Sequence, residues 1–407
     1  MAALLVNRFG LRASGQPTAR LLSDLADQLD KIGMQVRAVT AERVASGADT
    51  IFIYPRFVAL FVMLWRGVRQ PRAQVIVCLS DPPLVLMVGR LLGFWHRAPV
   101  IYWCQDVYPD VLAGLAWPRV MAPLMPLILG VVRWCHGVLM AGCAARVVPG
   151  QCLAKRLEQH CPATAKTPVL VLPNWPEPGL TPQPMPNTAD TDHGAPLTVL
   201  YSGHYGHGHD LTDLISLAEH VGDQAEQTLH ITIALSPRGL ARWQSRHGNQ
   251  PLPSSITVRP MVAGYALADH LAAAHIHVVS IKDAVSGAIM PSKAMASLCI
   301  GRPILLLGGA GSSLDTALTS HDFGLRVPSG DVTTARAWLE GLAADRARLE
   351  QLGRQAQDYG QRLAAQHSLT RLSSLVSHMA GDPVLTPDPA HKKNQQKTMV
   401  EWEQHNA

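Results

Sequence analysis

The chain has 407 residues, of which 47% are hydrophobic and only 16% are charged, and its formal net charge at pH 7 is +5. The length favours two domains, and the composition supplies enough apolar residues for two large cores. These values exclude an intrinsically disordered chain, and the slight positive charge does not indicate nucleic-acid binding.

The first part of the chain alternates strand-length apolar runs with helical segments. A strand at Ala2–Val6 precedes a helix from about Pro17 to Lys31, whose leucines recur at helical spacing, and a second strand follows in Met34–Thr40. Further strands are predicted at Thr50–Ile53, Gln74–Leu79, Pro99–Trp103, Arg146–Val148 and Pro168–Leu172. This alternation predicts an α/β domain with a mainly parallel sheet over residues 1–175. Ligands of such sheets bind at the carboxyl ends of the strands.

Two apolar stretches of this domain, Ile51–Trp65 and Val120–Val132, raise the question of membrane contact. Each is shorter than the ~20 apolar residues that span a bilayer, and both contain proline. They are either buried helices of a large core or the apolar face of a protein that rests on a membrane. In the second case Trp65, Trp117 and Trp134 would lie in the lipid interface while nearby arginines face anionic headgroups.

A change of composition separates the two halves of the chain. Residues 176–196 contain six prolines and no apolar periodicity, which predicts a linker. The alternation of strands and helices then restarts and predicts a second α/β domain with closing helices over residues 197–380. Its predicted strands are Leu197–Tyr201, Leu229–Leu235, Ser255–Arg259, His277–Ile281, Ile304–Leu307 and Gly324–Val327. Residues 381–407 are polar and predict a solvated tail.

Cysteine usage and the first residues bear on the compartment. The seven cysteines are scattered and never spaced as Cys-x2-Cys, so they favour neither a disulfide framework nor a zinc site. The opening MAALLVNRFG has no basic region followed by an apolar core, so a secretory signal is not expected. Both observations lead us to expect a cytoplasmic protein, with association to the membrane as an open question.

The most informative stretch is SGAIMPSKAMASLCIGRP, residues 286–303. It follows the β-branched apolar run HIHVVSIKD and predicts a helix that begins near Pro291 and ends by Gly301. Proline lacks a backbone N–H and suits the first turn, and the free amides and positive helix end at Ser292 and Lys293 attract phosphate. The alternative is an ordinary crossover between parallel strands with a lysine on its surface.

Short motifs occur in a fixed order between residues 7 and 331. They are NRFGLRASGQPTARLLSDLADQL at the start, QDVYPD at 105–110, VVPG at 147–150, LPNW at 172–175, YSGHYGHGHD at 201–210, VVSIKD at 278–283, PSK and GRP within 291–303, and GLRVPSGD at 324–331. In this order they resemble glycosyltransferase family 4, most closely its bacterial fucosamine-transferase and colanic-acid type of surface-polysaccharide enzymes. The resemblance implies the α/β fold called GT-B, in which two Rossmann-like domains with mainly parallel sheets face each other across a cleft.

The resemblance also implies a retaining, hexosyltransferase-type transfer of a sugar from a nucleoside diphosphate sugar to an acceptor that enters from the first domain. Such enzymes generally need no metal, so helix amides and cations would neutralise the leaving diphosphate. On this chain Gly203 would lie by the diphosphate, Lys293 and Lys282 would supply charge, and Gly15 would let a substrate approach the backbone. We therefore expect no cofactor and no metal, with the nucleotide sugar as donor substrate.

The chain departs from the family pattern at the donor site. The family often carries two glutamates eight residues apart, and these places hold Ala288 and Ala296 here. Alanine cannot accept hydrogen bonds from sugar hydroxyls as a carboxylate does. Recognition of the donor must therefore differ from the family pattern or be absent.

Histidines stand in the turn where many family members have arginine and lysine. The turn carries His204, His207 and His209, with Gly208 close to the expected lysine, although His209 followed by Asp210 matches the closer subgroup. Mostly neutral imidazoles would stabilise a diphosphate less than cations do. The histidines either ligate a metal, because imidazole is a common ligand, or form a phosphate-facing or exposed turn.

Gln105 and Asp106 are the candidate catalytic residues of the first domain. Gln105 stands where the family often has a histidine, and Asp106 follows a hydrophobic strand whose end would lie at the cleft. Asp106 either orients the acceptor or acts as its base, or else it caps the helix after Tyr108. Before the linker, Trp175 is expected to pack and Asn174 to bond to turn backbone.

These observations lead us to expect an enzyme that adds one sugar to a lipid-linked precursor of an exopolysaccharide or another cell-envelope glycan. The expected partners are the nucleotide sugar, the acceptor and, through peripheral contact, the inner face of the cytoplasmic membrane. The alternative is a non-catalytic protein of the same fold, a partner or regulatory subunit, because Ala288 and Ala296 replace the glutamates. A hydrolase or epimerase is a more distant candidate, since no Ser-His-Asp arrangement or carboxylate cluster can be placed.

Overall fold

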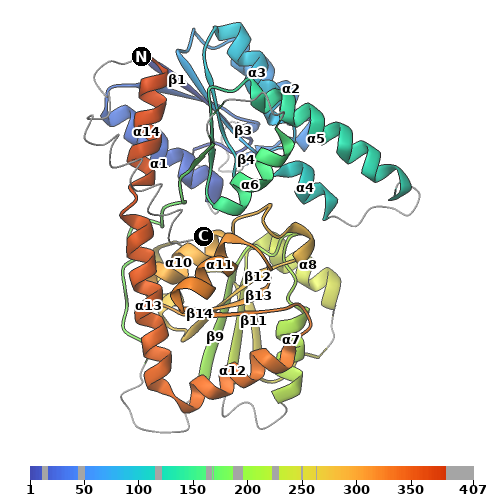
Figure 1. The fold of residues 1–407 in the computed structure, drawn as a ribbon, viewed down its shortest axis with the longest axis vertical. Coiled ribbons are helices and arrows are strands. Elements are labelled where there is room, and N and C mark those ends of the chain that lie inside the picture. The colour runs from blue at the N-terminus through green and yellow to red at the C-terminus, as the bar shows by residue number, and fades with distance from the viewer. Residues whose placement is uncertain are drawn as a thin grey trace.

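The computed structural model describes residues 1–11, 17–44, 51–114, 122–161, 167, 169–186, 196–221, 229–248, 251–262 and 264–381. Two α/β domains lie one above the other along the long axis of the molecule (Figure 1). Gly15, Trp117, residues 187–195 of the linker and the tail beyond Gly381 fall outside the described residues. So do the first residues of the predicted strands at Thr50 and Pro168 and the start of the apolar stretch at Val120.

The first domain has a six-stranded, wholly parallel sheet of order β2-β1-β5-β6-β7-β8. Its strands are β1 Ala2–Val6, β2 Gln35–Val39, β5 Val75–Leu79, β6 Val100–Trp103, β7 Ala145–Val148 and β8 Val169–Val171. The predicted strand at Thr50–Ile53 exists as β4 Ile51–Ile53, but it pairs antiparallel with β3 Glu42–Val44 in a separate two-stranded sheet. Its apolar run predicts a strand but not which strand it pairs with.

Helices cover both faces of this sheet. On one face lie α2 Arg56–Val68, α3 Val85–His96, α5 Met125–Ala141 and α6 Gln151–His160, and the short α4 Tyr108–Ala113 follows β6. On the other face α1 Pro17–Lys31 buries the leucines predicted as its apolar side. α14 Ser368–Met379, which was expected among the closing helices of the second domain, packs against α1 instead, through Leu372 and Val376.

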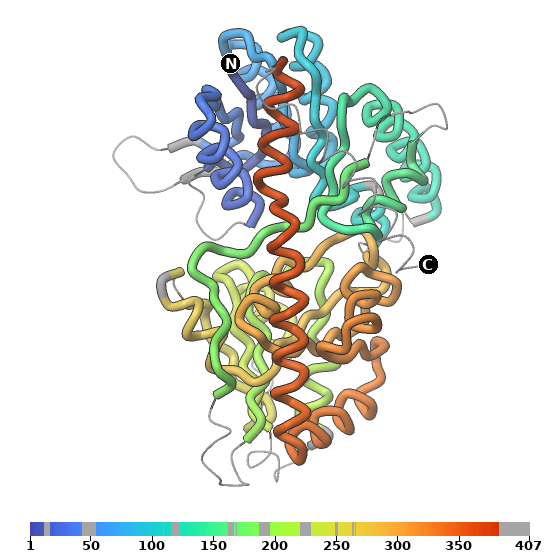
Figure 2. Tube along the Cα trace, turned by 60° about the vertical axis from the view of Figure 1, so that its left-hand side comes forward, coloured from blue at the N-terminus to red at the C-terminus, as the bar shows by residue number. Residues whose placement is uncertain are grey.

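The second domain repeats the parallel arrangement with the strand order β11-β10-β9-β12-β13-β14. Its strands are β9 Leu197–Gly203, β10 Leu229–Leu235, β11 Ile256–Pro260, β12 Ile276–Ile281, β13 Ile304–Gly308 and β14 Gly324–Val327. Its helices are α7 Thr212–Val221, α8 Pro237–His247, α9 Leu267–Ala272, α10 Ser292–Ile300, α11 Ser313–His321, α12 Val332–Ala344 and α13 Arg346–Ala364. In Figure 2, α13 and α14 form a column along both domains. The predicted α/β class with two mainly parallel sheets is confirmed.

Two helices of the second domain show what local sequence can and cannot reveal. α10 begins after Pro291 and ends at Gly301, which adopts the left-handed conformation (φ +79°), as the sequence predicts. α8 was not predicted, because its sequence PRGLARWQSRH offers few apolar residues for a periodic pattern. The oxygen of Ser236 caps α8 and Trp243 anchors it in the core.

Candidate functional site

In each sheet there is one place where the strand order reverses, and ligands of open α/β sheets bind beside such a switch point. In the first domain it lies between β1 and β5, and in the second between β9 and β12. The carboxyl ends of these strands lead to Arg8 and Asp81 in one domain and to His204 and Lys282 in the other. Most of the predicted site residues of the second domain lie at the second switch point.

Lys293, in the first turn of α10, is enclosed by groups from the end of β9. Its ammonium nitrogen donates to the Tyr201 hydroxyl (3.0 Å) and the His204 carbonyl (3.1 Å), and it lies 3.3 Å from Nε2 of His209. All three partners are neutral, and no carboxylate of the described residues forms an ion pair with this lysine. Burial therefore lowers the pKa of Lys293 to about 7.

His209 is fixed as an acceptor toward Lys293. Its Nδ1 donates to the Ser280 carbonyl (2.6 Å), which leaves the Nε2 lone pair facing the ammonium. Burial, and then the charge of Lys293, lowers the pKa of His209 to about 3, so the ring is neutral near pH 7. The imidazole thus holds the lysine in place without cancelling its charge.

Gly203 leaves room for the side chain of Lys293 to pass close to the backbone. It ends β9 with φ +137°, and a Cβ atom there would lie 2.5 Å from Cε of Lys293. A side chain at this position would displace the lysine, so glycine is required by the close approach as well as by the backbone. The sequence identified Gly203 and Lys293 separately, and the fold brings them into contact.

The other predicted residues of the turn have separate partners. Lys282 faces Asp210 (3.8 Å), so its charge is offset, and Ser292 is exposed at the start of α10. His204 bonds to Ser236 Oγ (2.8 Å) while His207 contacts Arg242 (2.9 Å), so the imidazoles point to different groups. Across the described part of the chain, no three His, Cys, Asp or Glu side chains are grouped so as to hold a metal ion.

Asp106 follows β6 and provides the acidic half of the site. Its backbone N–H donates to Ser80 Oγ (3.2 Å), while its carboxylate makes no hydrogen bond or ion pair with a described residue. Burial, and then the charge of Asp81, raises the pKa of Asp106 to about 7, in the range that suits a general base. The capping alternative is wrong, since Val107 is the cap residue of α4 and no side chain caps that helix.

Asp81, which the sequence reading missed, stands next to Asp106 at the end of β5. Its carboxylate accepts a hydrogen bond from the Tyr108 hydroxyl (3.1 Å) and lies 4.0 Å from both Arg8 and Arg56. Burial raises the pKa of Asp81 despite these two cations. Its place in SDPP, directly after a predicted strand, is a signal that could have identified it.

Gln105 is held in the first domain by Asn174. Their two amides form a reciprocal pair, with Asn174 Nδ2 donating to Gln105 Oε1 (2.8 Å) and Gln105 Nε2 donating to Asn174 Oδ1 (3.2 Å). Asn174 was expected to bond to turn backbone, and it binds this side chain instead. Trp175 packs as expected, stacked on Trp103 with 5.7 Å between ring centroids.

The two domains touch directly beside Asp106. Asp106 and Ile289 form an antiparallel bridge, and the Val107 N–H donates to the Ala288 carbonyl (2.8 Å). Ala288 is fully buried among core residues of the first domain, and Ala296 packs near Leu271. Neither alanine offers a polar side-chain group. The carboxylate next to Ala288 is that of Asp106, and this carboxylate has no partner among the described residues.

A buried ion network, also missed from the sequence, supports this contact. Asp110 on α4 accepts from Arg133 (2.8 Å), lies 3.3 Å from Arg156 and 3.3 Å from His160, and is 4% exposed. Burial alone would raise the pKa of Asp110, but the bonds and charges of His160 and Arg133 outweigh it and lower the pKa to about 2. Arg156 also donates to the carbonyl of Ser286 in the second domain (2.6 Å).

No protein-family model and no curated protein sequence matches the chain. Solved structures do resemble it. Sucrose-phosphate synthase from Thermosynechococcus elongatus has a TM-score of 0.73 at 15% identity, over 93% of this chain and 98% of that one. Anabaena HepE in complex with UDP and glucose scores 0.64 at 12% identity, over 93% and 100%. WaaG, a glycosyltransferase involved in lipopolysaccharide biosynthesis, scores 0.65 at 11% identity, over 93% and 100%.

These likenesses extend over nearly the whole of each chain, both sheets included. At such low identity they concern the fold alone. The chain therefore has the fold that its motifs implied, GT-B, with two Rossmann-like α/β domains.

Proposed function

We propose that the protein is a glycosyltransferase of the family 4 type, which moves a sugar from a nucleoside diphosphate sugar to an acceptor hydroxyl. The observation that carries this proposal is the ammonium of Lys293, enclosed by neutral groups at the second switch point. A buried cation without a counter-ion favours an anionic ligand, and the positive end of α10 adds to that preference. The fold shared with HepE, which was solved with UDP and UDP-glucose, supports a uridine nucleotide.

In this proposal Lys293 acts on the leaving group. When the bond between the anomeric carbon and the diphosphate oxygen breaks, its electron pair passes to the diphosphate. When the donor binds, before this bond breaks, a phosphate oxygen takes the place of His209, the longest of the three contacts of the ammonium. Charge that develops on the leaving oxygen is stabilised by a cation already held in place, so little reorganisation is needed.

Asp106 acts on the acceptor in the same proposal. Its unpaired carboxylate lies at the boundary between the domains, where it accepts the proton of the acceptor hydroxyl as that oxygen bonds to the anomeric carbon. We propose retention of the anomeric configuration and a lipid-linked acceptor of an exopolysaccharide or envelope glycan pathway, at the inner face of the cytoplasmic membrane. No cofactor or metal enters this scheme.

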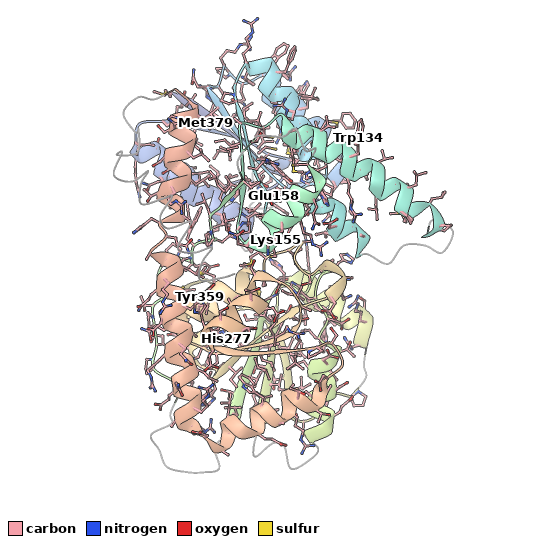
Figure 3. All side chains as sticks on the ribbon, in the orientation of Figure 1. Trp134, Lys155, Glu158, His277, Tyr359 and Met379 are labelled. Atoms are coloured by element: carbon pink, nitrogen blue, oxygen red, sulfur yellow. The ribbon has the colours of Figure 1, made fainter. Side chains whose placement is uncertain are left out.

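The first test is calorimetric titration of the full chain with UDP. Replacing Lys293 by alanine should weaken binding about 10- to 100-fold, because a charge-assisted contact to phosphate is lost. Lys155→Ala is the matched control, since this exposed lysine of α6 also lies near the domain boundary (Figure 3) but has no contact with Lys293. Equal loss in both variants, or no UDP binding by the native protein, would contradict the assignment.

A second candidate function is that of a non-catalytic subunit. The burial of Ala288 and the apolar packing of Ala296 favour it, because neither side chain can accept a hydrogen bond as the glutamates of the family pattern would. Turnover separates the two candidates. A transferase releases UDP from UDP-sugars in the presence of membrane extract, whereas a subunit binds UDP without releasing it from any donor.

A further inference from the structure

Exposed apolar side chains are concentrated in one region of the molecule. Among the described residues, every exposed large apolar side chain except Met1 and Ile32 lies between residues 57 and 138. The most exposed are Phe94 (86%), Phe57 (76%), Phe61 (76%), Leu127 (70%) and Trp134 (69%). Single exposed apolar residues are ordinary, but a concentration of this kind marks an interaction surface.

These side chains share one side of the first domain. All but Leu84 and Leu124 belong to α2, α3 and α5, and α3 packs against both of the other helices (Figure 1). Each helix buries one side against the sheet and presents a second apolar side outward, as Trp134 does on α5 (Figure 3). We call the exposed residues Phe57, Val58, Phe61, Trp65, Met87, Leu91, Phe94, Trp95, Leu127, Ile128, Val131, Trp134 and Val138 the apolar face.

The charges around the apolar face have one sign. α2, α3 and α5 contain no aspartate or glutamate, and they carry Arg56, Arg66, Arg90 and Arg133. The segments between them add further arginines, of which Arg69 lies 3.6 Å from the ring centroid of Trp65. All acidic residues between positions 51 and 157 belong to the site or its ion network: Asp81, Asp106 and Asp110.

We propose that the apolar face docks on an anionic phospholipid bilayer, with its aromatic rings in the interface and the exposed arginines Arg69, Arg72 and Arg97 on the headgroups. Apolar and aromatic residues near exposed arginines, on helices that carry no carboxylate of their own, complement a surface that is apolar inside and negative outside. A second copy of the chain fits poorly, because pairing two such faces would oppose arginine to arginine. Among the described residues no helix is long and apolar enough to cross a bilayer.

This inference rests on the proposed function, which it deepens by orienting the site toward a lipid-linked acceptor. α2 begins at Arg56, which lies 4.0 Å from Asp81. α5 supplies Arg133 to Asp110 on α4, the helix directly after Asp106. Docking through these helices would hold the acidic half of the site at a fixed distance from the headgroups.

The test is flotation of the full chain with vesicles of phosphatidylglycerol mixed with phosphatidylcholine, and with vesicles of phosphatidylcholine alone. We expect binding to the anionic vesicles that weakens with salt. The triple variant Phe61→Ser, Phe94→Ser, Trp134→Ser should lower the bound fraction about tenfold or more, since it removes three large interfacial side chains. Ile32→Ser, an exposed apolar residue (39%) outside the face, is the control and should bind like the native protein.

Each result has a distinct meaning. The inference is overturned if the native protein does not bind anionic vesicles. It is also overturned if the triple variant binds them as the native protein does. If the native protein is a dimer and the triple variant is a monomer, a second copy of the chain occupies the apolar face, and the inference is again overturned. UDP titration of the same samples separates the two proposals. Vesicle binding without UDP binding would contradict the transferase assignment alone. UDP binding without vesicle binding would contradict only the docking surface.

Discussion

The two halves of the site differ in the sign of their charge, and in each half the charged group lacks a neutralising partner of its own. Lys293 in the second domain bonds to a hydroxyl, a carbonyl and an imidazole, whereas Asp106 in the first domain has a carboxylate beside it in Asp81. The pKa of each is displaced to about 7, downward for the lysine and upward for the aspartate. Each domain thus holds one ionisable group at the site that no group of opposite charge balances.

The largest effect is expected at the acidic half. Asp106→Asn keeps the size of the side chain but removes the base, so kcat should fall about 100- to 1000-fold while UDP affinity changes less than about twofold. Initial rates of UDP release together with calorimetry check this split. A comparable loss of UDP affinity would show that the two halves are not separate.

A smaller effect is expected at Gly203. In Gly203→Ala the new methyl group meets Cε of Lys293, and the flexible lysine moves away from Tyr201 and His209. UDP affinity should fall about tenfold, because the ammonium no longer has a fixed place. Gly341→Ala on α12, where an added methyl group meets nothing within 4 Å, is the control. Unchanged affinity in the first variant would mean that the position of Lys293 does not matter.

The smallest effect is the pH dependence of UDP binding at Lys293. The folded pKa of Lys293 is about 7 against 10.5 ordinarily, so the unfolded chain binds more protons between these values and the free energy of unfolding rises with pH there. A diphosphate selects the protonated lysine, so UDP affinity should fall about fivefold from pH 7 to pH 8. Titrations in two buffers with different ionisation enthalpies should show proton uptake that Lys293→Ala abolishes. If proton uptake persists in this variant, a group other than Lys293 takes up the proton.

Much of the fold is predictable because its signals are local. Leucines at helical spacing define α1, and the proline and glycine at the ends of α10 define its bounds. Lys293 and Gly203 are prominent in the same way, through a helix start and a strand end. α8 shows the limit, because a short helix anchored mainly by Trp243 has too few apolar residues to form a pattern.

Two parallel-sheet domains, the helix that carries Lys293 and the strand end that carries Asp106 can all be predicted from the chain, since they depend on residues close together in it. Three features required the folded structure: Asp81 lies beside Asp106, Ala288 belongs to the core of the other domain, and three apolar helices share one exposed face. These features arise from contacts between residues far apart in the chain, and neither periodicity nor local propensity encodes which distant segments meet.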